Sequence, residues 1–139
     1  MDAFCVHILA ADRNFYEGPC ESLIVPASDG ELGILAHHSN MIAAVAPGTL
    51  RFRLPGETAW QLAAVSAGMV KVEQNDVVVL VDSAERPEEI DAARAKREAD
   101  EAREALLQKK SLQEHKIAEA SLARALNRLR VKSAAGMGQ

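Results

Sequence analysis

Long apolar runs are missing from this 139-residue chain, although 48% of its residues are hydrophobic. No stretch approaches the ~20 consecutive apolar residues that a helix needs to cross a bilayer. The first residues, 1–6, carry an acidic group and resemble neither a secretory signal nor an arginine-rich transit peptide. We therefore expect a chain that has enough apolar residues for a core and works in a cytosol-like compartment.

Cysteine is scarce, with only Cys5 and Cys20. In a cytosol-like compartment, two cysteines are more often small buried hydrophobic residues than a disulfide. Their spacing matches no zinc-binding pattern. The adjacent His37 and His38 have no Cys or carboxylate cluster beside them, and neighbouring residues rarely bind the same ion. The sequence therefore predicts no metal site.

Glycine and proline are confined almost entirely to the first half of the chain. No proline follows Pro87, and no glycine lies between Gly68 and Gly136. Residues 88–135 are instead rich in Ala, Glu, Lys, Arg and Leu, a composition that favours helix. The segment 83–91 joins the two halves, because Pro87 and the carboxylates after it suit the first turn of a helix.

The fold class follows from these two patterns. Strand-like segments with turns every 8–12 residues predict a flattened antiparallel β-sandwich or barrel of eight to ten short strands over residues 1–84. Residues 108–110 place cations where a helix should end, and residues 111–114 then form a capping-box pattern. We therefore expect an α+β protein in two domains, 1–84 and 85–139, the second an antiparallel two-helix hairpin.

The predicted seam of the hairpin is narrow and rich in alanine. Its members are Ile90, Ala93, Ala99, Ala102 and Leu106 in the first helix and Ala118, Leu122, Ala125, Leu126 and Leu129 in the second. Small residues let two helices pack closely but bury little area. Since a fully buried large side chain contributes only ~1.5–3 kcal/mol before ordering costs, we expect a marginal hairpin that can open.

Charge is also divided unevenly. Residues 1–84 have a net charge of −6 and residues 85–139 a net charge of +2, and 116–132 hold five basic residues against Glu119 alone. A basic helix can contact nucleic acid, but this one has neither interleaved aromatic residues nor a groove-reading motif. An acidic surface on a protein partner would suit the basic helix as well as nucleic acid would. We expect no nucleic-acid partner.

The chain also carries a series of short motifs. They are Tyr16-Glu17-Gly18, Asp29-Gly30-Glu31-Leu32-Gly33-Ile34-Leu35 with His38, Pro47-Gly48, residues 64–72, residues 77–82 before Ala84-Glu85, Ile90-Asp91-Ala92-Ala93-Arg94-Ala95 and residues 123–129. In this order, over roughly residues 3–132, they resemble the ε subunit of the rotary proton-translocating ATP synthase. The sequence departs from the family pattern at Ala36, Asn40-Met41 and Ala67, so the shape of the 36–41 loop is not predicted.

The resemblance implies a non-catalytic subunit of the central stalk that couples the γ shaft to the membrane-embedded ring of c subunits. It implies a peripheral protein that is held by the complex without direct membrane insertion. A bacterial and a plastid source both fit the sequence, and we expect the cytoplasmic face of a bacterial membrane. The hairpin would be a movable brake on ATP hydrolysis that reaches the catalytic α and β subunits when extended. The residues that the resemblance assigns to the shaft and c-ring are Asp29, Gly30, Glu31, Leu32, His38 and Met41.

In some relatives the hairpin binds regulatory ATP, and no other cofactor is implied. The candidate nucleotide-binding residues are Glu85, Ile90, Asp91, Arg94, Arg124 and Arg128, and the candidate inhibitory contacts are Arg124, Arg128 and Arg130. Arg124 and Arg128 lie on one helical face and with Arg94 could clamp a polyphosphate. Against this, Glu101 stands where a further arginine is expected. The alternative is that these arginines are exposed surface residues that pair with nearby carboxylates of the hairpin.

Two alternatives belong to other classes. A small β-sandwich hydrolase would use Asp29, His37 and His38, but the chain lacks a nucleophile elbow, a paired-carboxylate motif and a phosphate loop. A coiled-coil adaptor would dimerise through residues 88–131, but the seam is rich in alanine and the heptads are few.

Overall fold

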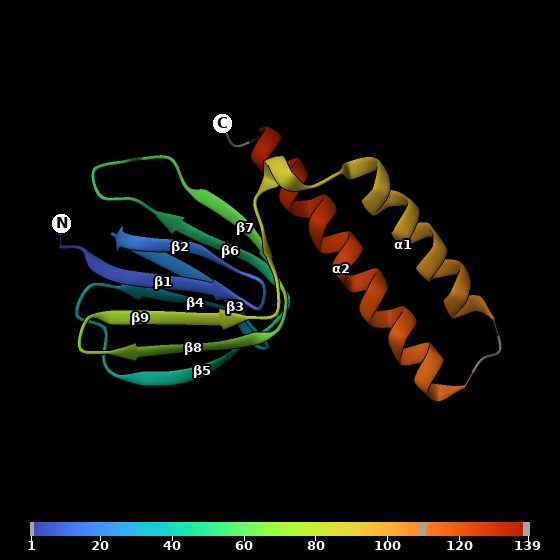
Figure 1. Cartoon of the computed structure of the whole chain (residues 1–139), viewed down its shortest axis with the longest axis horizontal. Coiled ribbons are helices and arrows are strands. Elements are labelled where there is room, and N and C mark those ends of the chain that lie inside the picture. The colour runs from blue at the N-terminus through green and yellow to red at the C-terminus, as the bar shows by residue number, and fades with distance from the viewer. Residues whose placement is uncertain (1, 109–110, 138–139) are drawn as a thin grey trace. The chain divides into compact units, whose positions relative to one another are not determined.

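The computed structural model describes residues 2–108 and 111–137. The chain divides into two units, Met1–Arg86 and Pro87–Gln139. The first consists of two five-stranded β-sheets and the second of a helical hairpin (Figure 1). The predicted fold class, a β-sandwich followed by a two-helix hairpin, is confirmed.

The strands of the first unit form two sheets. In order across the first sheet they are β2 (Arg13–Cys20), β1 (Phe4–Ala10), β9 (Asp76–Val81), β8 (Gly68–Glu73) and β5 (Met41–Val45). In the second sheet they are β10 (Ala84–Glu85), β7 (Gln61–Val65), β6 (Gly48–Arg53), β3 (Ser22–Ala27) and β4 (Gly30–Leu35).

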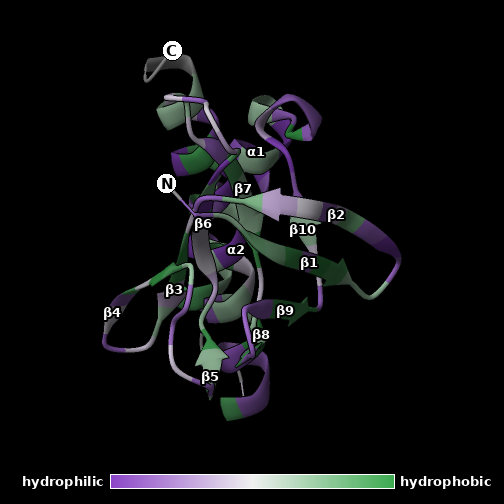
Figure 2. Cartoon of the chain, turned by 90° about the vertical axis from the view of Figure 1, so that its left-hand side faces the viewer, coloured by the Kyte–Doolittle hydropathy of each residue, from purple (hydrophilic) through white to green (hydrophobic). Residues whose placement is uncertain are grey.

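One pair of neighbouring strands is parallel, although the sequence predicts an antiparallel sandwich. Strand β1 pairs with β9 in parallel, and the other pairs along both sheets are antiparallel. Parallel neighbours need a long crossover, and here residues 11–75 supply it. Both strands are largely hydrophobic (Figure 2). Because successive side chains point to opposite faces of a sheet, some of these apolar side chains face away from the core.

The core lies between the two sheets and follows the alternation of the strands. Its fully buried large side chains come from several strands of both sheets and include Ile8, Leu23, Ile34, Leu50, Phe52 and Val79. Gly68 is required by close packing inside the first sheet. A Cβ atom there would overlap the Leu80 carbonyl oxygen and lie 2.7 Å from the Cα atom of Val81.

The second unit begins with a 3₁₀ turn, η1 (Pro87–Glu89), and continues with α1 (Ala92–Leu107) and α2 (Leu112–Met137). The Asp91 carboxylate caps α1 by accepting from the backbone N–H of Arg94 at 3.1 Å. Ser111 caps α2 by accepting from the N–H of Glu114 at 3.2 Å, as the capping-box pattern predicts. The predicted contribution of Lys109 and Lys110 lies outside the described residues.

The seam of the hairpin is built largely from alanine. Its buried residues are Ala95, Ala99 and Ala102 from α1 and Ala118, Ala125, Asn127 and Val131 from α2, with Ile90 preceding α1. The prediction for Ala93 was wrong, because this residue is exposed. Ala95 has the four-three spacing to Ala99 and Ala102 that keeps residues on one helical face, whereas Ala93 is two positions away from that face.

Candidate functional site

The six residues predicted to contact the shaft and c-ring form two groups, one at each end of β4. Asp29 lies in the turn before β4, and His38 and Met41 follow the end of the strand. At about 3.3 Å per residue, the six-residue strand separates the groups by ~17 Å. One small domain can therefore present the two groups to two different partners.

The first group is the edge at the start of β4, residues 29–32. Gly30 has a φ of 131°, which side-chain-bearing residues rarely adopt, and a Cβ there would meet nothing within 4 Å. Glycine is therefore needed for its conformation. The neighbouring Glu31 is not a free charge, because Nη2 of Arg51 donates to both of its oxygens at 3.0 and 2.9 Å.

The second group lies in the loop 36–40 and the start of β5. This loop is tied to the β8–β9 turn: the N–H of His37 donates to Oδ1 of Asn75 at 2.7 Å, and the N–H of Gln74 donates to Oδ1 of Asn40 at 2.9 Å. Asn40, which replaces a proline of the family pattern, thus fixes the loop through its side chain. His38 donates from Nδ1 to the backbone carbonyl of Ser39 at 2.8 Å.

The outer face of the first sheet carries an apolar surface that the sequence analysis missed. The side chains of Ile42, Met69 and Leu80 are 67%, 38% and 44% exposed, on the adjacent strands β5, β8 and β9. Register places Ala44, Met69, Leu80 and Leu9 in one row and Ile42, Lys71, Val78 and His7 in the next. We call Leu9, Ile42, Ala44, Met69, Val78 and Leu80 the outer apolar patch.

A signal for the outer apolar patch was present in the sequence. Residues 77–81 are apolar without interruption, so both faces of β9 had to be apolar, and only one can face the core. A contiguous apolar patch on a protein surface marks an interaction site.

In the hairpin, Glu98 brings two of the three predicted phosphate-binding arginines together. Its oxygens accept from Nε of Arg94 at 3.0 Å and from Nη1 of Arg128 at 3.2 Å, which joins α1 to α2. Arg124 is exposed on α2 and takes no part in this cluster. The sequence analysis missed Glu98, although its position four residues after Arg94 was a signal.

The remaining nucleotide candidates are dispersed. Ile90 is buried at the base of the hairpin, Asp91 is used as the helix cap, and Glu85 lies in β10 of the first unit. Of the predicted inhibitory contacts, Arg124 and Arg130 are exposed, whereas Arg128 is half-buried in its ion pair with Glu98.

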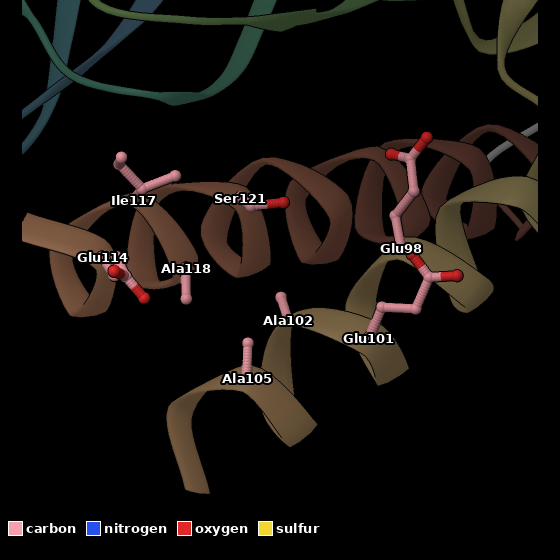
Figure 3. A pocket seen from close by; sticks show the side chains of 8 residues that line it. All are labelled: Glu98, Glu101, Ala102, Ala105, Glu114, Ile117, Ala118 and Ser121. Carbon is pink, nitrogen blue, oxygen red and sulfur yellow. The ribbon is translucent and has the colours of Figure 1, made fainter. Parts of the chain in front are cut away.

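A space of about 340 Å³ lies between the two helices (Figure 3). Its walls include three carboxylates, Glu98, Glu101 and Glu114, together with small residues such as Ala102 and Ala118. No basic side chain is among its lining residues, so this space does not suit a polyphosphate. It is a groove open to solvent beside the alanine seam.

The titration of three side chains in the first unit is shifted. Partial burial, followed by the nearby carboxylates of Asp76 and Glu17, raises the pKa of the Cys5 thiol. Burial also raises the pKa of Cys20 and of Tyr16. Both cysteines are free; Cys20 is buried as expected, but Cys5 is exposed, so the prediction of two buried cysteines was wrong for Cys5.

The groups proposed for a hydrolase do not converge. His37 pairs through Nε2 with the Asp2 carboxylate at 2.9 Å, and Asp29 lies at the other end of β4.

In the part of the chain that the structure covers, no helix has the length and apolar character needed to span a membrane.

Comparison with known proteins identifies the class. Residues 3–87 match the family model described as ATP synthase, Delta/Epsilon chain, beta-sandwich domain, and residues 88–133 match the one described as ATP synthase, Delta/Epsilon chain, long alpha-helix domain. The two models together represent the delta/epsilon chain of ATP synthase, a non-catalytic subunit. The chain belongs to the ATP synthase delta/epsilon chain family. This confirms the family predicted from the motifs, and neither the hydrolase nor the coiled-coil adaptor is retained.

Similar sequences cover almost the whole chain. The ATP synthase epsilon chain of Ruminiclostridium cellulolyticum is 42% identical over 93% of this chain and 95% of its own length. That of Caldanaerobacter subterraneus is 43% identical over 94% of each. Among solved structures, a chain of the Euglena gracilis mitochondrial ATP synthase shares the fold with a TM-score of 0.81 and 22% identity, covering 96% of this chain and 81% of that one.

Proposed function

We propose that this chain couples the γ shaft of an ATP synthase to its ring of c subunits through the β-sandwich, and that its hairpin acts as a movable brake on ATP hydrolysis. The observation that carries the coupling role is the outer apolar patch. It spans four adjacent strands, and an exposed apolar surface of this kind is stabilised when a partner covers it.

The patch and the second group of predicted residues adjoin each other. His38 lies in the loop before β5, at the end of the strand where Ile42 belongs to the patch, whereas Met41 packs partly against the core from the opposite face of β5. We assign the patch and this neighbouring loop to the γ shaft. The edge at residues 29–32 lies at the other end of β4 and is assigned to the c-ring, which gives the domain two separate partners.

The brake is supported by the composition of the seam. The helix α1 buries only alanines, and each contributes far less than the ~1.5–3 kcal/mol of a large buried side chain. The partly exposed ion pairs of Glu98 contribute about 0–1 kcal/mol each. Because these contributions to stability are small, the hairpin can open. Residues 88–131 would then extend ~66 Å as one helix, far enough to reach catalytic α and β subunits.

In the open state, the exposed cations Arg124 and Arg130 would meet carboxylates of the catalytic subunits, with Arg128 joining them once it leaves Glu98. Regulatory ATP would favour the closed state by bridging Arg94 and Arg128, with Arg124 nearby on α2. The subunit would be peripheral, on the cytoplasmic face of a bacterial membrane and held by the complex. Its similarity to bacterial epsilon chains supports this location.

The experiment that tests the coupling role places a charge in the outer apolar patch. Ile42→Glu or Leu80→Glu should abolish co-purification with γ, because burying an unpaired carboxylate against an apolar partner is costly. Leu107→Glu is the matched control, since Leu107 is 87% exposed at the end of α1, outside the β-sandwich. Normal γ binding by both patch variants, with the fold retained, would exclude the patch as the docking surface.

A further inference from the structure

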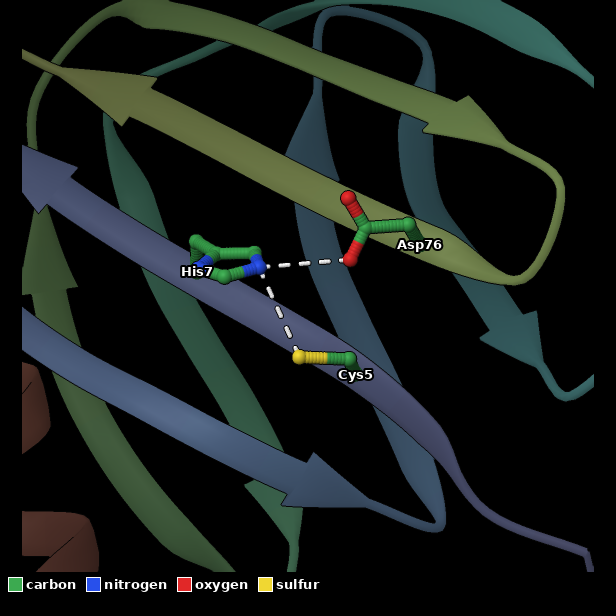
Figure 4. Close-up of side chains that lie close together, drawn as sticks. All are labelled: Cys5, His7 and Asp76. Atoms are coloured by element: carbon green, nitrogen blue, oxygen red, sulfur yellow. Dashed lines mark hydrogen bonds and ion pairs between the residues drawn. The ribbon is translucent and has the colours of Figure 1, made fainter.

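Three side chains with metal-binding atoms converge on the outer face of the first sheet, at the start of β1 (Figure 4). Cys5 and His7 are two positions apart and therefore point to the same face of β1. Asp76, at the start of β9, lies directly opposite Cys5 in the parallel register. The ligand atoms of the three residues all lie within 4.8 Å of one another.

The distances within this cluster fit a tetrahedral ion. Around Zn²⁺ with usual bond lengths, a sulfur and a nitrogen ligand are about 3.6 Å apart, and a nitrogen and an oxygen ligand about 3.4 Å. Here Sγ of Cys5 lies 3.4 Å from Nε2 of His7, and that nitrogen lies 3.2 Å from Oδ1 of Asp76. The third pair, Sγ of Cys5 and the Asp76 carboxylate, lies within 4.8 Å, and a sulfur and an oxygen ligand of one tetrahedral zinc ion are about 3.6 Å apart, so side-chain movements of up to about an ångström would complete the geometry.

A fourth residue orients the histidine. Glu17, on the neighbouring strand β2, is paired with His7 and places Oε1 2.8 Å from Nδ1. Metal-bound histidines usually donate their second ring N–H to a carboxylate, which fixes the tautomer and the ring orientation. With the Nδ1–H held by Glu17, the lone pair of Nε2 faces Cys5 and Asp76.

We propose that Cys5, His7 and Asp76 bind one Zn²⁺ ion, that Glu17 positions His7, and that water supplies the fourth ligand. Thiolate, imidazole and carboxylate together are a donor set that suits zinc. Binding releases the thiol proton of Cys5 to solvent, because the thiolate is the form that coordinates. The ion would join β1 to β9 directly and to β2 through Glu17.

This site departs from the prediction that the sequence has no metal site. The segment Cys5-Val6-His7 is too short to form a zinc pattern by itself, and Asp76 follows His7 by 69 positions. Only the parallel pairing of β1 with β9 brings the third ligand to the other two. The site borders the outer apolar patch, because His7 lies beside Val78 and two positions before Leu9 on the same face of β1. It is therefore tested on the isolated chain, where a failure to bind zinc leaves the proposed docking of γ untouched.

Zinc titration of the full-length chain, with and without substitutions, tests the site. We expect one Zn²⁺ per chain, an affinity at least tenfold lower in Cys5→Ser and in His7→Ala, and a 10–100-fold lower affinity in Glu17→Ala. His37→Ala is the matched control, because His37 is an exposed histidine paired with a carboxylate but has no thiol beside it. It should bind zinc like the wild type.

Cobalt provides a readout that identifies the sulfur ligand. Co²⁺ in place of zinc should give a near-ultraviolet thiolate-to-cobalt charge-transfer band that disappears in Cys5→Ser and persists in Cys20→Ser. Circular dichroism would verify that each variant is folded. The proposal is overturned if the full-length chain shows no such band, if the band persists in Cys5→Ser, or if zinc binds equally well to the Cys5, His7 and His37 variants.

Discussion

Glu98 decides whether the hairpin can hold a polyphosphate. Its carboxylate already satisfies Arg94 and Arg128, so a phosphate must displace it to reach the same two guanidinium groups. The cluster therefore holds the helices together without a ligand. An incoming nucleotide would exchange one set of charge-assisted bonds for another, and it would gain only their difference.

Removal of this carboxylate charge should strengthen ATP binding. We expect Glu98→Gln to bind ATP more tightly than the wild type, because the amide competes poorly for two arginines. At about 100 times the dissociation constant, ATP should add ~2.7 kcal/mol to the stability of the hairpin, measured by thermal unfolding. Glu104→Gln, an exposed position on the same helix, is the control. If millimolar ATP leaves both Glu98→Gln and the wild type unchanged, the hairpin does not bind ATP.

Two glycines distinguish a position where close packing requires glycine from one where it does not. Gly68→Ala should destabilise the sandwich by about 1–3 kcal/mol, because the new methyl group would overlap the backbone of β9. Gly33→Ala should be neutral or slightly stabilising, since a Cβ there meets nothing within 4 Å. Urea unfolding of the full-length variants measures both. Equal stability for the two would show that β8 and β9 can separate to admit a side chain.

At the scale of elements, local sequence patterns predicted where the strands and helices lie better than they predicted which strands pair with one another. Gln74-Asn75-Asp76 is a turn sequence between two apolar segments, so the sequence alone indicates the β8–β9 hairpin. Both Gln74 and Asn75 adopt the positive φ values that a tight hairpin turn needs. The β1–β9 pair could not be predicted, because it depends on how the whole chain closes. The outer apolar patch and the Cys5 cluster both depend on that pairing.

The error in the seam has a similar origin. In a stretch as rich in alanine as residues 92–105, several helical faces offer small apolar residues, and spacing alone does not select one. Ile90 precedes the first residue of α1, so its three-residue spacing to Ala93 is not a helical spacing. The contact with α2 selects the face of Ala95, Ala99 and Ala102 instead.

The opening of the hairpin can be tested by locking its two helices. Ala102 and Ala118 are buried and line the same space between α1 and α2, so cysteines at both positions can be joined across it by a bismaleimide. If the brake requires opening, the locked complex should hydrolyse ATP faster than the same complex before cross-linking. The single variant Ala102→Cys, treated identically, controls for the reagent. Equal inhibition before and after locking would contradict the brake.

At the scale of the whole molecule, the core of the sandwich is self-contained. Its buried cluster runs from Phe4 to Ala84, and none of its members comes from the hairpin. Arg86 completes the unit, because its guanidinium lies 4.4 Å from the ring centroid of Phe15 and donates to the carbonyl of Phe15 at 2.9 Å. A truncation should therefore end after Arg86 and keep both β10 and this contact.

We expect the fragment 1–86 to fold, to bind γ and to support coupled ATP synthesis, since the outer apolar patch and both groups at the ends of β4 remain. Complexes that contain the fragment should hydrolyse ATP faster than those with the full chain, because the brake is gone.

Within the fragment, Arg86→Ala should lower the free energy of unfolding by about 1–3 kcal/mol, through loss of the ring contact and one charged hydrogen bond. Chemical denaturation measures this stability, and pull-down with γ measures binding. An unfolded fragment, or a folded one that fails to bind γ, would show that the hairpin is needed for coupling and not only for inhibition.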